Sequence, residues 1–256
     1  MLAISEDFTL FEPHALRLPW LVAFTTAARR GEERFDFTAE VGQEQRRALE
    51  RALAPLALTW LTLEHGSRVV TIGEPSVQPG VQPGLSPVCD GALIIHPGTA
   101  AAFTTADCLP VVIATTGRTH AAAAIHAGWR SLAAGIIEDA VERLARASGA
   151  QPPGFGAWIG PAIAREDYEV GSEVAERLLV RPAITEEQFT PVDAGHFLAD
   201  LPGAATAILV SCGVPAEAIE HYPVSTKQSP LLHSVRRDGS AAGRMATVVG
   251  IRNEVR

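Results

Sequence analysis

The stretch from residue 92 to residue 126 constrains the fold more than any other part of the chain. It contains four short, mainly apolar runs with β-forming residues: ALIIH, AAAFTTA, PVVIATT and HAAAAIH. Turn-forming pairs, Pro97-Gly98 and Gly117-Arg118, separate the first from the second and the third from the fourth. Runs this short between turn signals are typical of β-strands. We therefore predict four consecutive strands here.

Helical patterns surround this β-rich stretch. We predict helices over residues 43–54, over Ser131 to Ser148, over residues 170–180, and from an N-cap at Asp200 to Cys212; further strands are predicted in AWIGPAI and in MATVVGI. The segment EPSVQPGVQPGLSP is expected to be a surface loop because it is rich in Pro and Gly. Strands and helices mix without strict βαβ alternation, which favours a layered α+β fold. No linker divides the chain, so we expect one domain over residues 1–256.

Composition narrows the class of protein. The chain has 256 residues with 47% hydrophobic and 20% charged residues, as in globular proteins. Its formal net charge of -8 argues against nucleic acid as a partner, although a local basic patch could hold a small anion. The first ten residues lack a signal-peptide pattern, and the most apolar run is too short for a membrane span. Three cysteines without a C-x-x-C pair fit a reducing compartment. We expect a cytoplasmic protein, a monomer or small homo-oligomer, without membrane contact.

His65, Cys108 and His126 are the candidate metal ligands. If the third and fourth strands form a hairpin with a three-residue turn at 116–118, Cys108 lies directly opposite His126, with Cβ atoms about 4.5–5.5 Å apart. A zinc ion can bridge such a gap, and His65 follows a β-rich stretch as a third donor. Three protein ligands leave one position open, as catalytic zinc requires. Each residue also has a purely structural explanation, since a single cysteine is most often a small buried apolar residue.

The turn after His126 carries features that suit an anion. Gly128 allows close backbone approach, Arg130 adds a fixed charge, and the following helix start presents free N–H groups. Arg236 lies in a second basic cluster near the end of the chain. Neither a G-x-x-x-x-G-K-[ST] nor a G-x-G-x-x-G motif is present, so nucleotide triphosphate and dinucleotide binding lack support.

Four parts of the chain together form a recognisable pattern: FTTADCLPVVI, AAIHAGWRSLAAGI, WIGPAI followed by YEVGSEV, and HSVRRDG followed by GRMA. With these segments the chain resembles the YfiH family, also called the laccase-domain, multicopper polyphenol oxidase or zinc-dependent purine nucleoside phosphorylase family. The resemblance covers most of the chain from about residue 60. It implies an α/β/β/α sandwich of mixed sheets. It also places metal ligands at His65, Cys108 and His126, and implies phosphorolysis of adenosine, inosine or methylthioadenosine, with adenosine deamination as a second activity.

The chain departs from the family pattern at several positions. Gln-Val-His-Gly is replaced by Leu63-Glu64-His65-Gly66, and the Arg of F-[ST]-T-R is replaced by Ala27 unless Arg29 or Arg30 substitutes. The Cys of Gly-Pro-Cys-Ile is Ala162, and a Cys-Thr pair is Val224-Ser225. The metal trio is kept, whereas several positions expected to contact substrate differ.

These observations lead to a zinc enzyme that acts on purine nucleosides and phosphate. Arg130, with Gly128, the helix start and Arg236, is expected to hold the phosphate, and Asp107 or Glu64 to transfer protons. Three alternatives stay open. A copper oxidase needs about ten histidines for its copper centres, and the chain has eight. A binding or quality-control protein, including a peptidoglycan-editing factor, would release no base. A thiol hydrolase using Cys108 with His126 would work without metal.

Overall fold

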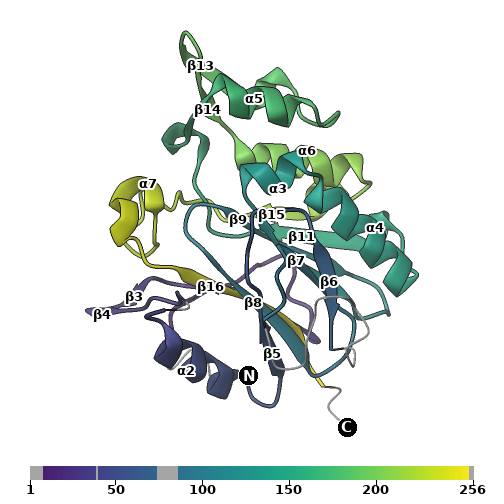
Figure 1. Ribbon diagram of the computed structural model, residues 1–256. Coiled ribbons are helices and arrows are strands. Elements are labelled where there is room, and N and C mark those ends of the chain that lie inside the picture. Colours follow the sequence, from purple (N-terminus) through teal and green to yellow (C-terminus); the bar gives the residue numbers. More distant parts are fainter. Residues whose placement is uncertain (1–7, 39, 74–85, 254–256) are drawn as a thin grey trace.

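Two mixed β-sheets form the centre of the protein (Figure 1). The computed structural model describes residues 8–38, 40–73 and 86–253. One sheet has the order β1 (Leu10–Phe11), β2 (Leu21–Thr26), β16 (Met245–Ile251), β8 (Thr99–Thr105) and β5 (Ala57–Trp60). The other has the order β15 (Ile219–His221), β11 (Phe155–Ile159), β9 (Leu109–Thr115), β10 (Ala122–Ala127), β7 (Gly91–Ile94) and β6 (Val69–Ile72). Each sheet combines antiparallel with parallel pairs.

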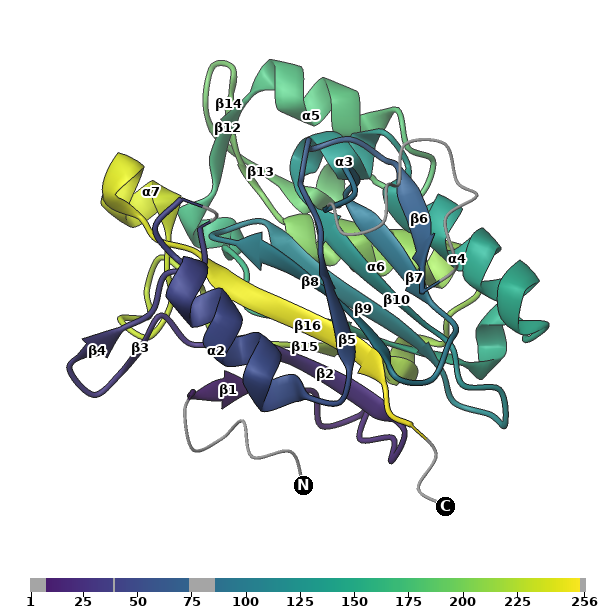
Figure 2. The same cartoon turned by 60° about the horizontal axis from the view of Figure 1, so that its bottom comes forward.

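Helices cover the outer faces of both sheets. The helices α4 (Ile136–Ser148) and α6 (Leu201–Ser211) pack on the sheet that contains β9 and β10, and α2 (Gln43–Leu53) packs on the sheet that contains β8 and β16 (Figure 2). Between the sheets lies a third core that includes Phe103, Val112 and Trp158. The predicted α/β/β/α sandwich is therefore confirmed.

The central strands are mainly apolar, and almost every position in them is buried, because each of their faces is covered. In β9, Val111 and Ile113 pack toward the helices, whereas Val112 and Ala114 pack between the sheets. Burial on both faces removes the polar–apolar alternation of a solvent-exposed strand. This explains why short continuous apolar runs predicted these strands.

Two expected details are wrong. The β9–β10 hairpin pairs His126 with Pro110, not with Cys108, because its loop has five residues, 116–120, instead of three. The helix expected over Ser131 to Ser148 is divided into α3 (Trp129–Ala133) and α4. Gly135 lies between them with a φ of 83°, a left-handed conformation that interrupts a right-handed helix.

The remaining strands and helices form a small additional sheet, a two-stranded hairpin and a short helix. A three-stranded sheet of β12 (Glu169–Gly171), β14 (His196–Ala199) and β13 (Phe189–Asp193) lies beside α5 (Ser172–Leu179) (Figure 1). The hairpin consists of β3 (Arg29–Arg30) and β4 (Glu33–Arg34), and the short helix is α7 (Val235–Asp238). Most of the expected Pro/Gly loop, residues 74–85, and the first seven residues lie outside the described part. No helix in that part is long and apolar enough to cross a membrane.

Candidate metal centre

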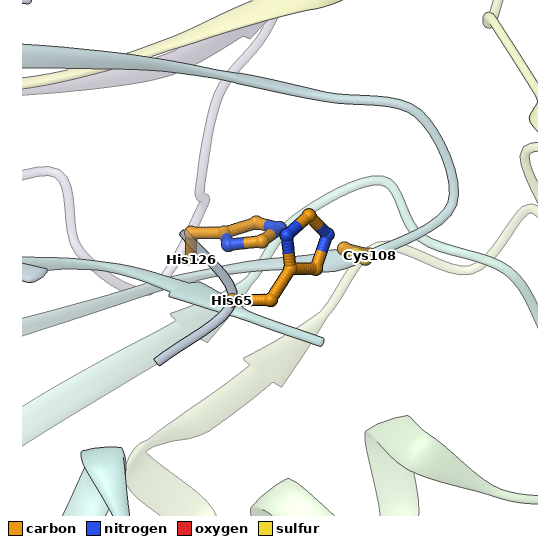
Figure 3. Close-up of side chains that lie close together, drawn as sticks. All are labelled: His65, Cys108 and His126. Atoms are coloured by element: carbon orange, nitrogen blue, oxygen red, sulfur yellow. The ribbon is translucent and has the colours of Figure 1, made fainter. Parts of the chain in front are cut away.

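Three potential metal ligands meet at one end of the two sheets. One ligand atom each from His65, Cys108 and His126 lies within 4.8 Å of the other two, and Figure 3 shows their side chains gathered at one point. The two imidazole rings are nearly perpendicular, with centroids 4.9 Å apart. Within the described residues this is the only such group of three or more His, Cys, Asp or Glu side chains. The arrangement could hold one metal ion.

A buried carboxylate holds the turn that carries His65. His65 has a φ of 60°, which is uncommon for a residue with a side chain. The carboxylate of Asp90 accepts hydrogen bonds from three successive backbone N–H groups, those of Glu64, His65 and Gly66, at 3.2, 2.9 and 2.8 Å. Asp90 itself is fully buried. These bonds offset the cost of the left-handed conformation and place the imidazole of His65 over the site.

The same carboxylate orients His126. Asp90 Oδ1 lies 2.8 Å from Nδ1 of His126, and the backbone N–H of His126 donates to the carbonyl of Asp90 at 2.7 Å. With Nδ1 bonded to the carboxylate, Nε2 is the atom left to bind a metal. A carboxylate–imidazole pair of this kind is common behind metal-binding histidines. Burial alone would raise the pKa of Asp90, but the hydrogen bonds from His126 and the backbone lower it.

Cys108 reaches the site from a bend and not from the hairpin ladder. It immediately precedes β9, after Asp107, whose φ of 86° turns the chain. Burial alone would raise the pKa of the Cys108 thiol, but hydrogen bonds to His126 and His65 lower it to about 6. Burial opposes the charging of His126, yet its bonds to Asp90 and Cys108 raise its pKa to about 9. The thiolate is therefore the form that predominates at neutral pH.

Gly128 leaves space for the trio. A Cβ atom at this position would lie 3.1 Å from Sγ of Cys108 and 3.5 Å from Cδ2 of His65. Its φ of -76° is accessible to any residue, so the available space and not the backbone conformation favours glycine here. The helix α3 that follows has only five residues, so the helix-start contribution expected from the sequence is small.

A cavity of about 570 Å³ opens beside the three ligands. Its lining includes His65, Cys108, His126, Gly128, Arg130 and Arg236, together with two further arginines, Arg46 and Arg244. Among the described lining residues the only carboxylate is that of Asp107. A basic cavity in a chain of net charge -8 is a local exception that suits an anionic ligand. Its volume lies within the range of small-molecule sites.

Of the side chains predicted to bind phosphate or transfer protons, three line the cavity and that of Glu64 does not. Arg130 and Arg236 both face the cavity, with their guanidinium groups 4.3 and 4.7 Å from the ring centres of Trp129 and Tyr168. Both carboxylate oxygens of Asp107 already accept hydrogen bonds, at 2.6 Å from the Thr226 hydroxyl and at 2.9 Å from the Arg236 backbone N–H. Glu64 is exposed and is absent from the cavity lining.

Two residues of the site were not predicted from the sequence. Asp90 stands between apolar residues in VCDGALII, and an acid in such a setting is the signal that could have identified it. Arg46 lies in a helix predicted correctly, but helical periodicity does not show that its side chain reaches a cavity. By contrast, Arg29, considered as a substitute for the missing family arginine, lines a different cavity.

The donor atoms fit a single soft or borderline metal ion. One thiolate and two imidazoles are ligands that zinc and copper both accept. A multi-copper arrangement does not fit, because the described residues bring together only this one group of three donors. The site therefore suits one ion whose other ligand would come from the cavity.

Comparisons with known proteins agree with this architecture. Residues 27–252 match the family described as multi-copper polyphenol oxidoreductase laccase. The chain is 33% identical over 210 residues to the purine nucleoside phosphorylase YfiH of Escherichia coli K12, covering 82% of this chain and 80% of that protein. The structure of YlmD from Geobacillus stearothermophilus superposes with a TM-score of 0.82 at 25% identity, covering 96% of this chain and 97% of that one. The Neisseria meningitidis protein NMB0706 superposes with a TM-score of 0.79 at 27% identity, covering 96% and 100%. The chain belongs to the YfiH, or laccase-domain, family.

Proposed function

We propose that this protein is a metal-dependent purine nucleoside phosphorylase that accepts adenosine, inosine or methylthioadenosine. The observation that carries the proposal is the single cavity that joins the His65–Cys108–His126 group to several arginines. Phosphorolysis needs one place for a nucleoside and one for phosphate, and this cavity offers room and positive charge for both. Relatives that are named purine nucleoside phosphorylase support the same activity.

Arg130 and Arg236 are the residues that we assign to the attacking phosphate. Both guanidinium groups lie against aromatic rings, which limits their freedom while leaving donor atoms for an oxyanion. Arg236 is held further by a bond from Nη1 to the carbonyl of Glu169 at 2.9 Å. Two oriented charges would place phosphate for attack on the ribose C1′ and reduce the entropy cost of bringing it there.

We assign zinc as the metal, held by His65, Cys108 and His126. When bound, the ion would supply Lewis-acid polarisation and orient the substrate. The chain's own contribution is to hold the donors in place, through Asp90 behind His126 and through the absence of a side chain at Gly128.

Adenosine deamination is the second activity that we propose. Three protein donors leave one position of a four-coordinate ion for another ligand, which hydrolytic chemistry needs. Among the residues assigned to proton transfer, Asp107 lies in the cavity but already accepts two hydrogen bonds, and Glu64 lies outside the cavity lining. These contacts favour a supporting role for Asp107 over direct proton transfer.

The test is base release from inosine, adenosine and methylthioadenosine, measured by chromatography with and without phosphate. We expect release that requires phosphate, is abolished in Cys108→Ala, and persists in Cys212→Ala, whose half-buried thiol is not among the cavity residues. Formation of inosine from adenosine in the same assay measures deamination. Undiminished turnover by Cys108→Ala would contradict the site. Binding without release would favour the binding protein, and activity after complete metal removal would favour the thiol hydrolase.

We also propose that the protein is cytoplasmic, that it is a monomer or a small homo-oligomer, and that residues 1–256 form a single domain. The charge and cysteine usage of the chain support the first of these.

A further inference from the structure

The cavity lining includes a second pair of arginines besides Arg130 and Arg236. We use the name α2 end for the part of the lining formed by Thr38, Arg46, Thr104 and Arg244. The segment before α2 ties the two arginines together. The carbonyl of Phe37 accepts a 2.9 Å hydrogen bond from Nε of Arg46, and its N–H donates to the carbonyl of Arg244 at 3.0 Å. Figure 2 shows α2 lying across β8 and β16, the strands that carry or follow the other two residues.

Both guanidinium groups keep unused hydrogen-bond donors. Arg46 stacks on Trp60 at 4.2 Å and uses Nε, and within the described residues its two Nη atoms have no acceptor. Arg244 uses Nη1 on the carbonyls of Ala242 and Gly243. Neither side chain forms an ion pair with an acid of the described ranges. Five donors in a fixed plane make an unpaired arginine a ready binder of oxyanions.

The acids near Arg46 are occupied elsewhere. Oδ1 of Asp36 accepts from the N–H groups of Thr38 and Arg244, each at 3.0 Å. Oε1 of Glu50 accepts from Nε1 of Trp60 at 2.9 Å. Burial lowers the pKa of Arg46, even though these two acids raise it. The charge of Arg46 is therefore only partly compensated by the protein.

A buried hydroxyl at the same end also lacks a partner. Oγ1 of Thr38 is shielded from solvent and makes no hydrogen bond to any described residue. Leaving a buried hydroxyl unsatisfied costs about 1–3 kcal/mol, and such groups in native proteins call for an explanation. A phosphoryl group carries acceptor oxygens, which are the partners that the free arginine donors need and that this hydroxyl lacks among the described residues.

We propose that Thr38, Arg46, Thr104 and Arg244 form a subsite for a phosphoryl group, distinct from the Arg130 and Arg236 pair. The subsite and the metal ligands are within reach of one molecule. Thr104 and Cys108 are four residues apart, so at most about 14 Å separates them along an extended chain. A nucleoside 5′-phosphate could bridge that distance, and the inorganic phosphate of the proposed reaction is the other source of the same group. The choice of these ligands rests on the proposed function.

Binding measurements on the metal-loaded protein test the subsite. Inorganic phosphate, inosine 5′-phosphate and inosine are titrated separately by calorimetry into the wild type, Arg46→Gln, Arg46→Lys and Arg47→Gln. We expect Arg46→Gln to lower the affinity for inorganic phosphate, for inosine 5′-phosphate or for both about ten- to hundredfold. The affinity for inosine should not change. Arg46→Lys should lose less, because the charge remains. The neighbour Arg47 is exposed and is absent from the cavity lining, so Arg47→Gln should bind all ligands like the wild type.

The pattern of losses distinguishes the source of the phosphoryl group. A loss confined to inorganic phosphate identifies free phosphate as the source of the group, and a loss for inosine 5′-phosphate identifies a phosphorylated nucleoside. Equal affinities of wild type and Arg46→Gln for both, or no binding of either by the wild type, would overturn the subsite. If Arg46→Gln is unfolded by circular dichroism, Thr104→Val takes its place with the same expected loss and the same overturning result. Base release from inosine is measured separately, so this subsite and the proposed function can fail independently.

Discussion

Asp90 and His126 form a 2.8 Å hydrogen bond between Oδ1 and Nδ1 in a region closed to solvent, with 0% of Asp90 and 2% of His126 exposed. The other oxygen of the same carboxylate accepts from the backbone next to His65. One buried acid thus connects the turn of His65 with the strand of His126. The protein's own contacts therefore set the relative position of these two imidazoles.

Replacing Asp90 with Asn tests this connection. The carboxylate of Asp90 uses two oxygens to accept from three backbone N–H groups and from His126. The amide of asparagine has only one acceptor oxygen and no charge, so the His65 turn loses acceptors and His126 loses its charged partner. We expect metal affinity to fall about ten- to hundredfold and the free energy of unfolding to fall by roughly 1–3 kcal/mol. Competition with a chromogenic chelator measures the first quantity and urea unfolding the second.

Asp139→Asn is the matched control for that substitution. Asp139 lies on α4 and pairs with Arg143 in a partly exposed i,i+4 ion pair, a contact of small energetic value. This variant should bind metal like the wild type. Wild-type metal affinity in Asp90→Asn would show that the two histidines do not depend on the carboxylate.

Gly128→Ala tests the space beside the ligands. The added methyl group would lie 3.1 Å from Sγ of Cys108, so the thiolate must shift. We expect about tenfold weaker metal binding, equivalent to roughly 1–2 kcal/mol of crowding, with little change in secondary structure. Gly117→Ala is the control, since a Cβ atom there meets nothing within 4 Å. Equal metal affinity in both variants would show that the site tolerates a side chain at Gly128.

The strands and the meeting of His65, Cys108 and His126 could be predicted from the sequence, but the contacts that bring these three side chains together could not. Apolar runs identify strands buried on both faces, and His65, Cys108 and His126 do meet. The reason given for the meeting of Cys108 and His126 was wrong. Loop length sets hairpin register, and the five-residue loop moves Cys108 beyond the ladder. The left-handed bend at Asp107 and the common carboxylate of Asp90 bring the donors together. The bend leaves no local signature, and the acidic residue among apolar neighbours at Asp90 does not show which donors it connects.

The arginines of the cavity also show that contacts between distant segments are hard to predict from the sequence. Arg130 is predicted to hold phosphate because it follows the candidate ligand His126 in the sequence, and its side chain does line the cavity. Arg46 lies on α2, more than sixty residues before Cys108 in the sequence, and only tertiary packing brings it to the cavity. Local patterns predict neighbours along the chain far better than contacts between distant segments.

Asp107→Asn separates positioning from proton transfer. In Asp107→Asn a single neutral amide oxygen replaces the two charged acceptors that hold the Thr226 hydroxyl and the backbone N–H of Arg236, so the position of Arg236 is held less firmly. We expect KM for phosphate to rise about tenfold while the pH dependence of kcat keeps its shape. Steady-state kinetics between pH 5 and pH 9 measure both. Loss of one limb of the kcat profile would instead identify Asp107 as the acid or base.

The final prediction concerns protons released when metal binds. Burial alone would raise the pKa of Cys108 and lower that of His126, but their mutual hydrogen bond and the contacts with His65 and Asp90 reverse both directions. The values become about 6 for Cys108 and about 9 for His126. Between these values the metal-free site contains a thiolate and an imidazolium. A metal needs the thiolate and a neutral imidazole.

Metal binding at pH 7.5 should therefore release about one proton, which comes from His126. Affinity should rise about tenfold per pH unit between pH 6 and pH 9, level off above pH 9, and fall more steeply below pH 6 as Cys108 also takes up a proton. Calorimetry in buffers of different ionisation enthalpy counts the protons. Cys212→Ala should release the same number, because that thiol lies outside the trio. A binding enthalpy that is independent of the buffer would show that His126 is already neutral in the metal-free protein.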